Sequence, residues 1–181
     1  MPDSYVIEYC APTLAGIKTG SLFSFESATK EESNKEIILL NRILRKKGLR
    51  AIPLRRNKKR TLLYLYRPSR LAKDLKNEET KEILSSKGYN CDNPDICVVQ
   101  LIKKLSSDKD FPHEIGLFLS YPPFDVKCFM CNPSKGVKCI GCWKVYGNEN
   151  EAQKTFNNYK KSTELLKKEL KEGKNLTQLV A

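Results

Sequence analysis

The chain has 181 residues, of which 40% are hydrophobic and 30% are charged. This balance is typical of a globular protein of one domain with a single core. The first residues lack a secretory signal, and no run approaches the roughly 18 apolar residues of a membrane span. We therefore expect a cytoplasmic protein that is neither secreted nor membrane-spanning.

The net charge is +12. It favours acidic partners, which include nucleic acid, an anionic membrane surface or an acidic protein, and it does not choose among them. The stretch from Arg42 to Arg60 contains ten Lys and Arg residues and no acid. It could be a docking surface, or simply the solvated end of a helix and a solvated hairpin.

The first third of the chain predicts a strand, two helices and then a hairpin. Residues 5–9 are β-prone, and a helix is expected from Ala11 to Phe23, with Pro12 in its first turn. Thr29 and Glu32 fit a capping box, and Gly48 ends the helix that follows it.

Two strands are expected over residues 50–55 and 61–66, around a basic turn. Residues 62–66 are apolar throughout, which is typical of a strand buried on both faces. Short helices should follow over 69–76 and 78–86.

Asn93 and Pro94 open a helix that should end near Leu105. The apolar run from Glu114 to Ser120 is predicted to be the central strand of the sheet. Tyr121, Pro122 and Pro123 end it.

One or two helical turns are expected over residues 123–130, and a strand over Trp143–Tyr146. The last helix should run from Asn150 to Gly173. Alternating strands and helices predict an α/β or α+β fold, a mixed sheet with packed helices. We expect one catalytic domain over residues 1–173 and a frayed tail over 174–181.

The seven cysteines are odd in number and are expected to be reduced thiols, used for core packing, metal binding or catalysis. Cys10 stands where a helix is predicted to begin, and the helix dipole there would favour its thiolate. His113, the one histidine, lies beside the best predicted strand. Together they suit a papain-like nucleophile and base, provided that folding joins them. Otherwise Cys10 is a small core residue and His113 a surface or capping residue.

In this mechanism His113 takes the proton of Cys10, and the thiolate attacks an acyl carbonyl. Backbone amides at the start of the Cys10 helix would hold the oxyanion. His113 then activates water or an amine. Asp125 is preferred over Glu114 as the residue that orients His113, because neighbours on a strand face opposite ways. The alternative role of Asp125 is that of an acid in the first turn of a helix.

A second constellation consists of two C-x-x-C pairs separated by seven residues, some of which suit a turn. Such pairs predict a Cys-rich knuckle over residues 128–142 that holds structural zinc, with an iron–sulfur cluster as a lesser alternative. Unrelated thiols are the other interpretation. The four cysteines are Cys128, Cys131, Cys139 and Cys142.

Three segments, Tyr9–Lys18, Phe111–Leu119 and Cys142–Tyr146, resemble a clostridial family catalogued as a domain of unknown function. The likeness extends over nearly the whole chain, and His-Glu-Ile-Gly-Leu-Phe-Leu followed by Tyr-Pro-Pro is its most specific part. One branch of that family is a papain-like amide synthase of closthioamide-type thioamide antibiotic biosynthesis. The cysteines at 128, 131 and 142 depart from the family pattern.

The resemblance implies a papain-like core and a transferase with a cysteine nucleophile. It would form an amide bond from an acyl thioester on an acyl carrier protein and a small amine acceptor. No cofactor is expected beyond the possible zinc, and membrane and nucleic acid are not expected as partners. The alternatives are a cysteine peptidase or thioester hydrolase, and a zinc-stabilised nucleic-acid-binding module.

Overall fold

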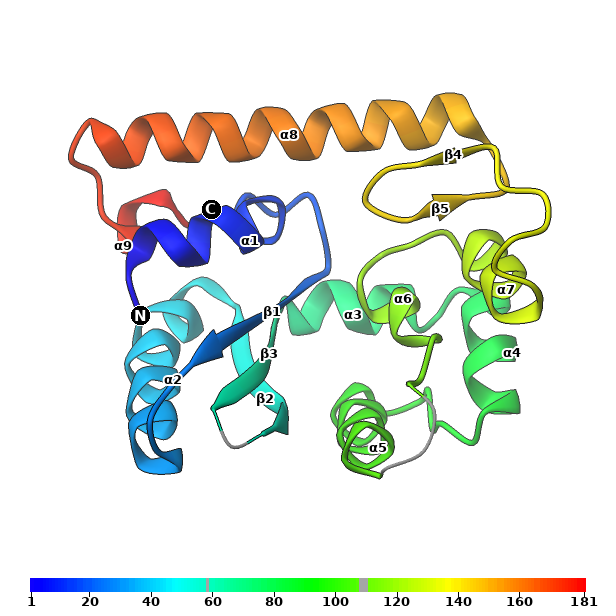
Figure 1. Ribbon diagram of the computed structural model, residues 1–181, viewed down its shortest axis with the longest axis horizontal. Coiled ribbons are helices and arrows are strands. Elements are labelled where there is room, and N and C mark those ends of the chain that lie inside the picture. The colour runs from blue at the N-terminus through cyan, green and yellow to red at the C-terminus, as the bar shows by residue number, and fades with distance from the viewer. Residues whose placement is uncertain (58, 108–110) are drawn as a thin grey trace. The chain divides into compact units, whose positions relative to one another are not determined.

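The computed structural model describes residues 1–57, 59–107 and 111–181, and Figure 1 shows the course of the chain. The chain divides into two compact units. Unit 1 consists of Met1–Arg70 and Lys161–Ala181, and unit 2 of Leu71–Lys160. The predicted α/β class is confirmed, and the papain-like core stays a prediction.

Unit 1 contains a three-stranded antiparallel sheet in the order β1-β3-β2. Its strands are β1 (Gly20–Glu26), β2 (Arg50–Arg56) and β3 (Arg60–Tyr66). The predicted hairpin of β2 and β3 is therefore confirmed. A bulge between Pro53 and Arg55 shifts its register, and β2 is an edge strand.

Helix α1 (Asp3–Leu14) corrects the predictions for residues 5–9 and Ala11–Phe23. The β-prone side chains lie inside this helix, because Val6, Ile7 and Cys10 recur at helical spacing on its buried face. The helix ends at Leu14, and the element that follows it is β1, a strand of seven residues. Pro12 therefore lies in the last turn of a helix, not in the first.

Helix α2 (Lys30–Leu44) begins as its cap predicts, since Thr29 Oγ1 accepts a hydrogen bond from Glu32 N at 3.1 Å. A 3-10 turn, η1 (Arg45–Lys47), continues it to Gly48, whose φ of 72° ends the helix. The Asn41 side chain fastens α2 to β2. Its Nδ2 donates to Ala51 O at 2.7 Å, and its Oδ1 accepts from Ala51 N at 2.9 Å.

The end of the chain is ordered, against the expectation of a frayed tail over 174–181. Helix α9 (Leu176–Leu179) has a capping box at Asn175, and Leu176, Leu179 and Val180 are buried in the core of unit 1. Apolar burial of these three side chains holds the segment in place.

Unit 2 is mainly helical. Helices predicted over 69–76, 78–86, 123–130 and from Asn93 are confirmed, and the hairpin of β4 and β5 follows them. The elements are α3 (Pro68–Asp74, whose first residues belong to unit 1), α4 (Glu78–Ser86), α5 (Pro94–Ser106), α6 (Ile115–Phe118), α7 (Pro123–Cys131), β4 (Cys139–Ile140) and β5 (Lys144–Val145).

The predicted central strand over Glu114–Ser120 is wrong, because Ile115–Phe118 form the short helix α6. All four of its residues are buried. A short, fully buried apolar run has no periodicity that separates a strand from a helix. The strand expected at Trp143–Tyr146 shrinks to the two residues of β5.

Helix α8 (Glu149–Lys171) confirms the last predicted helix, and it starts in unit 2 and ends in unit 1. It is long but rich in charged side chains. In the described part of the chain, no helix combines the length and the apolar composition that a membrane crossing needs.

We expect Arg67→Ala to destabilise unit 1. The Arg67 guanidinium donates to Thr13 O at 2.8 Å, to Leu14 O at 2.7 Å and to Ala181 O at 2.8 Å. It thereby adds donors to two carbonyls at the end of α1, of which Thr13 O also accepts from Gly16 N and Leu14 O from Ala181 N. The loss should be about 2 kcal/mol, measured by urea unfolding with circular dichroism. The exposed Arg45→Ala is the control, and an equal effect of both would contradict this role.

Candidate functional site

Cys10 lies in the core of unit 1 and is 0% exposed. Burial raises the pKa of its thiol far above the ordinary value, and the charge of Lys18 and a hydrogen bond with Ser21 oppose this rise only in part. A thiol in this environment stays protonated at neutral pH, which is the opposite of what a nucleophile needs.

The position of Cys10 within α1 removes the help expected from a helix start. The helix begins at Asp3, so Cys10 lies in its third turn rather than at its N-terminus. The stabilising field of a helix end falls off within one turn. Backbone amides at this depth in a helix also donate within the helix, so they are not free to hold an oxyanion.

His113 belongs to unit 2, where it precedes α6 in an exposed turn. Its ring packs edge-on against Phe129, with 5.1 Å between ring centroids, and against Phe111 at 5.9 Å. Cys10 belongs to unit 1, so neither unit by itself contains the predicted pair.

His113 does line a cavity of about 240 Å³ within unit 2. Most of its walls are aromatic or aliphatic, and α6, α7 and the β4–β5 hairpin supply them. Gly116 makes the close packing possible, because a Cβ there would lie 2.9 Å from Val126 and 3.0 Å from the Tyr121 ring. Besides His113, the cavity is lined by the side chains of Tyr121, Asp125, Phe129, Trp143 and Lys144.

Asp125 holds the hairpin against α7. Its Oδ2 accepts from Trp143 Nε1 at 2.7 Å, and its Oδ1 accepts from Tyr146 N at 2.9 Å and Gly147 N at 2.8 Å. The side chain is buried although charged residues seldom are, and these three donors compensate for its desolvation.

The observed role of Asp125 differs from the predicted one. Among the described residues its partners lie in the hairpin, and none is the His113 ring. It does stand in the first turn of α7, as the alternative interpretation had it. Glu114, the other candidate, is buried and accepts a hydrogen bond from Tyr89 Oη at 3.1 Å.

Trp143 forms the aromatic wall of the cavity together with Tyr121, at 5.0 Å between centroids. The Phe156 ring supports Trp143 edge-on at 4.6 Å. Burial, together with nearby Cys142, raises the pKa of Tyr121 to about 12. The phenol is therefore neutral at physiological pH.

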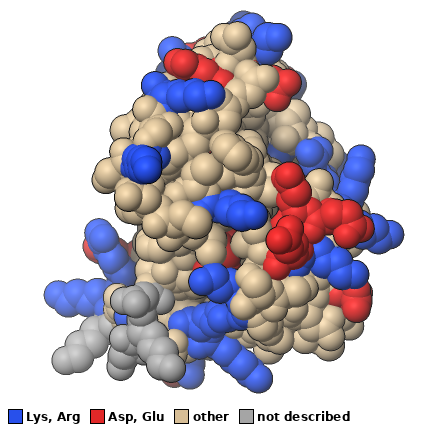
Figure 2. All heavy atoms as spheres, turned by 90° about the vertical axis from the view of Figure 1, so that its right-hand side faces the viewer, with Lys and Arg blue, Asp and Glu red and all other residues tan. Residues whose placement is uncertain are grey.

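Lys144 supplies the positive charge of the cavity. Its Nζ donates to Pro133 O at 2.9 Å and lies 5.6 Å from the centroid of the Phe129 ring. An ammonium group has three donors, so this contact leaves hydrogen-bonding capacity for a ligand. The surrounding side of the molecule carries both acidic and basic side chains (Figure 2), so local charge rather than a large field sets the preference here.

The four cysteines of the predicted knuckle are divided among separate elements, and the zinc site stays a prediction. Cys128 and Cys131 lie on α7, Cys139 lies in β4 and Cys142 in the turn after it. In the described ranges, no three His, Cys, Asp or Glu side chains group in a way that could hold a metal ion. Cys139 Sγ instead accepts a hydrogen bond from Gln153 at 3.7 Å.

The family model described as "Protein of unknown function (DUF3793)" matches residues 6–180. The chain belongs to this family. No curated protein and no solved structure matches it. The predicted unknown-function family is thereby confirmed, and nothing in the comparisons bears on the closthioamide branch.

The sequence analysis assigned no role to Tyr121, Phe129, Trp143 or Lys144, although they line the cavity with His113. One signal was available. The chain has a single Trp, and buried Trp usually needs a partner for its N–H. Asp125 was the nearest upstream acid in the same unit, so this pair could have been expected.

We expect native iodoacetamide labelling to spare Cys10 and to modify Cys131 and Cys142. The first thiol is buried and protonated, and the other two are exposed. Protection of Cys10 should exceed about 100-fold, since reaction requires local opening. Peptide mass spectrometry measures it, with labelling in urea as the control. Rapid native labelling of Cys10 would restore it as a nucleophile.

We expect Asp125→Ala to destabilise unit 2 by about 3 kcal/mol, because two buried donors and one partly buried donor lose a charged acceptor. Urea unfolding followed by Trp143 fluorescence measures the loss. Glu82→Ala is the matched control on the exposed side of α4 and should change stability by less than about 0.5 kcal/mol. Equal effects would show that the carboxylate does not hold the hairpin.

Proposed function

We propose that unit 2 binds a small aromatic molecule that carries an acidic group. The observation that carries this proposal is the cavity itself, which is lined by the chain's one Trp and one His together with Lys144. Ligand sites are typically concave, mostly apolar and furnished with a few polar groups that converge on the ligand. This cavity has those properties.

The size and walls limit the ligand. A volume of about 240 Å³ lies just under the range of roughly 300–1,000 Å³ common for ligand pockets, so one or two rings fit. Tyr121, Phe129 and Trp143 offer faces and edges for a planar ring, and aromatic pairs of this kind favour offset or edge-to-face contacts.

The polar groups favour a negative charge on the ligand. Both oxygens of Asp125 already accept hydrogen bonds, so its carboxylate is satisfied. Lys144 keeps donors for a ligand, and the described residues make no hydrogen bond to the His113 ring. A carboxylate could therefore accept from Lys144 and His113 while its ring lies against Trp143.

Cysteine-dependent acyl transfer stays a prediction and gains no support from the geometry of its nucleophile. Cys10 is buried, protonated and in the other unit from His113. Acyl carrier protein and amine acceptor remain predictions with it. The binding proposal needs only groups that lie together in unit 2.

Naphthalene-2-carboxylate and its neutral carboxamide test the proposal. The single indole N–H and the single imidazole give unambiguous NMR signals in the full-length protein. Both signals should shift on titration, and the acid should bind about tenfold more tightly than the amide because of its charge-assisted hydrogen bonds.

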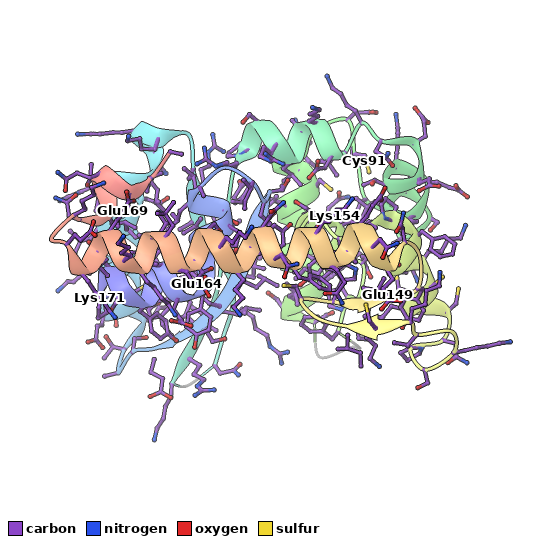
Figure 3. The ribbon with its side chains drawn as sticks, turned by 90° about the horizontal axis from the view of Figure 1, so that it is seen from above. Cys91, Glu149, Lys154, Glu164, Glu169 and Lys171 are labelled. Carbon is purple, nitrogen blue, oxygen red and sulfur yellow. The ribbon has the colours of Figure 1, made fainter. Side chains whose placement is uncertain are left out.

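Lys144→Met should abolish the preference for the acid. Lys154→Met is the matched control, since Lys154 lies on α8 (Figure 3), is exposed and does not line the cavity. Equal affinities for acid and amide would contradict the anionic preference. A titration in which neither ring signal moves would contradict the site.

A further inference from the structure

The net positive charge of the protein resides almost entirely in unit 1. Unit 1 has 20 Lys and Arg residues against 9 Asp and Glu, whereas unit 2 has 13 against 12. Unit 1 is thus +11 and unit 2 is +1. Both signs are visible together on the side that carries α4 and α7 (Figure 2). The feature to explain is therefore the net charge of unit 1, not that of the whole chain.

Most of this net charge comes from one continuous stretch of the sequence. The stretch from Arg42 to Arg60 has ten basic residues and no acid, and its described residues include the end of α2, η1, β2 and the first residue of β3. We define the basic surface by its eight exposed basic side chains, which are Arg42, Arg45, Lys46, Lys47, Arg50, Arg55, Lys59 and Arg60.

Side-chain hydrogen bonds fix the backbone that carries this surface. Asn41 bonds to both polar groups of Ala51, which joins the end of α2 to β2. Arg56 Nη2 donates to Asn34 Oδ1 at 2.6 Å and fastens the hairpin to the same helix. The basic side chains therefore project from one preorganised scaffold, which lowers the entropic cost of binding a ligand to all of them.

Stability alone accounts for only part of this arrangement. Cations near a helix C-terminus complement its dipole, and basic residues on an edge strand such as β2 prevent strand pairing between molecules. Those effects need two or three positive charges. They do not require that acids be absent over two turns of helix and a hairpin, where repulsion among the cations opposes folding.

The apolar residues decide what kind of partner fits. Leu44, Leu49, Ala51 and Leu54 are all buried, so among the described residues of this stretch no large apolar side chain is exposed. Protein interfaces normally have an apolar core inside a polar rim. The stretch also has no aromatic residue, which single-strand binding uses to stack bases. The exposed groups of this surface are mainly cations, of which Arg60 is paired with Glu26 at 3.1 Å, and such a surface suits the regular phosphates of a duplex.

We propose that the basic surface of unit 1 binds the phosphate backbone of double-stranded nucleic acid, without reading its sequence. The six arginines of the stretch include five that are exposed, and their planar guanidinium groups match phosphate geometry. Strand β2, with seven residues, extends about 20 Å, and a duplex presents a phosphate charge about every 1.7 Å of its axis. This partner differs from the acyl carrier protein that the family resemblance implied.

Fluorescence anisotropy with a labelled random-sequence DNA duplex about two helical turns long tests the proposal on the full-length protein. Affinity should fall steeply between about 50 and about 200 mM salt. The triple variant Arg45→Ala, Lys46→Ala, Lys47→Ala should bind at least about tenfold more weakly. The slope of log affinity against log salt should become shallower by about 2 to 3, since up to three phosphate contacts are lost.

Two control variants accompany the triple variant. The first tests whether the location of the removed charges matters, and the second tests whether the neighbouring apolar side chains contribute to binding. Lys103→Ala, Lys135→Ala, Lys154→Ala removes the same charge from exposed positions of unit 2 and should keep affinity within about twofold. Ile38→Ser, Leu39→Ser alters the exposed apolar residues on the preceding turns of α2 and should leave duplex binding unchanged.

Three results would overturn the proposal. The first is the absence of binding at about 50 mM salt, and the second is equal weakening by both triple variants. The third is a preference for vesicles of equal parts phosphatidylcholine and phosphatidylserine, or for polyglutamate, that the Ile38/Leu39 variant abolishes. That last outcome would identify a membrane or an acidic protein as the partner.

Discussion

The candidate ligand site depends on one buried carboxylate. Asp125 accepts hydrogen bonds from the Trp143 indole and from two consecutive backbone amides, and so fixes both the ring and the backbone of the hairpin. The hairpin has only two residues in each strand, too few to be stable by itself in water. Its position comes from this anchor and from the packing of Trp143 against Phe156.

The same anchor explains how a charged residue can line a mostly apolar cavity. Gly147 allows the close approach, because a Cβ there would lie 3.3 Å from Asp125 Oδ1. A carboxylate that accepts three hydrogen bonds is satisfied without water, so it does not make the cavity wet. The free hydrogen-bonding capacity of the cavity then belongs to Lys144 and to His113, and both present donors when protonated.

Signals that depend on a few neighbouring residues predicted most of the fold. Elements that depend on contacts with residues distant in the sequence were predicted wrongly. Caps such as Thr29 and Asn93, the stop at Gly48 and the β2–β3 hairpin were correct because each depends on a few neighbouring residues. The segments at 5–9 and 114–120 were wrong because short apolar runs depend on what they pack against. The environment of Cys10 was predicted wrongly for the same reason, since it was placed at the start of a helix, whereas it lies inside α1 and its burial is a property of the assembled core.

The two units meet opposite physical requirements, and their compositions follow from this. A cavity that recognises one acidic group needs few charges nearby, because an excess of cations would bind any anion, and unit 2 is close to neutral. A surface that binds a polyanion needs many cations instead. Salt screens exposed charges strongly and buried ones weakly, so the two kinds of binding should respond differently to ionic strength. Binding on the exposed basic surface should weaken as salt rises, whereas an aromatic acid enclosed beside Trp143 should be held largely by apolar contact that salt does not screen.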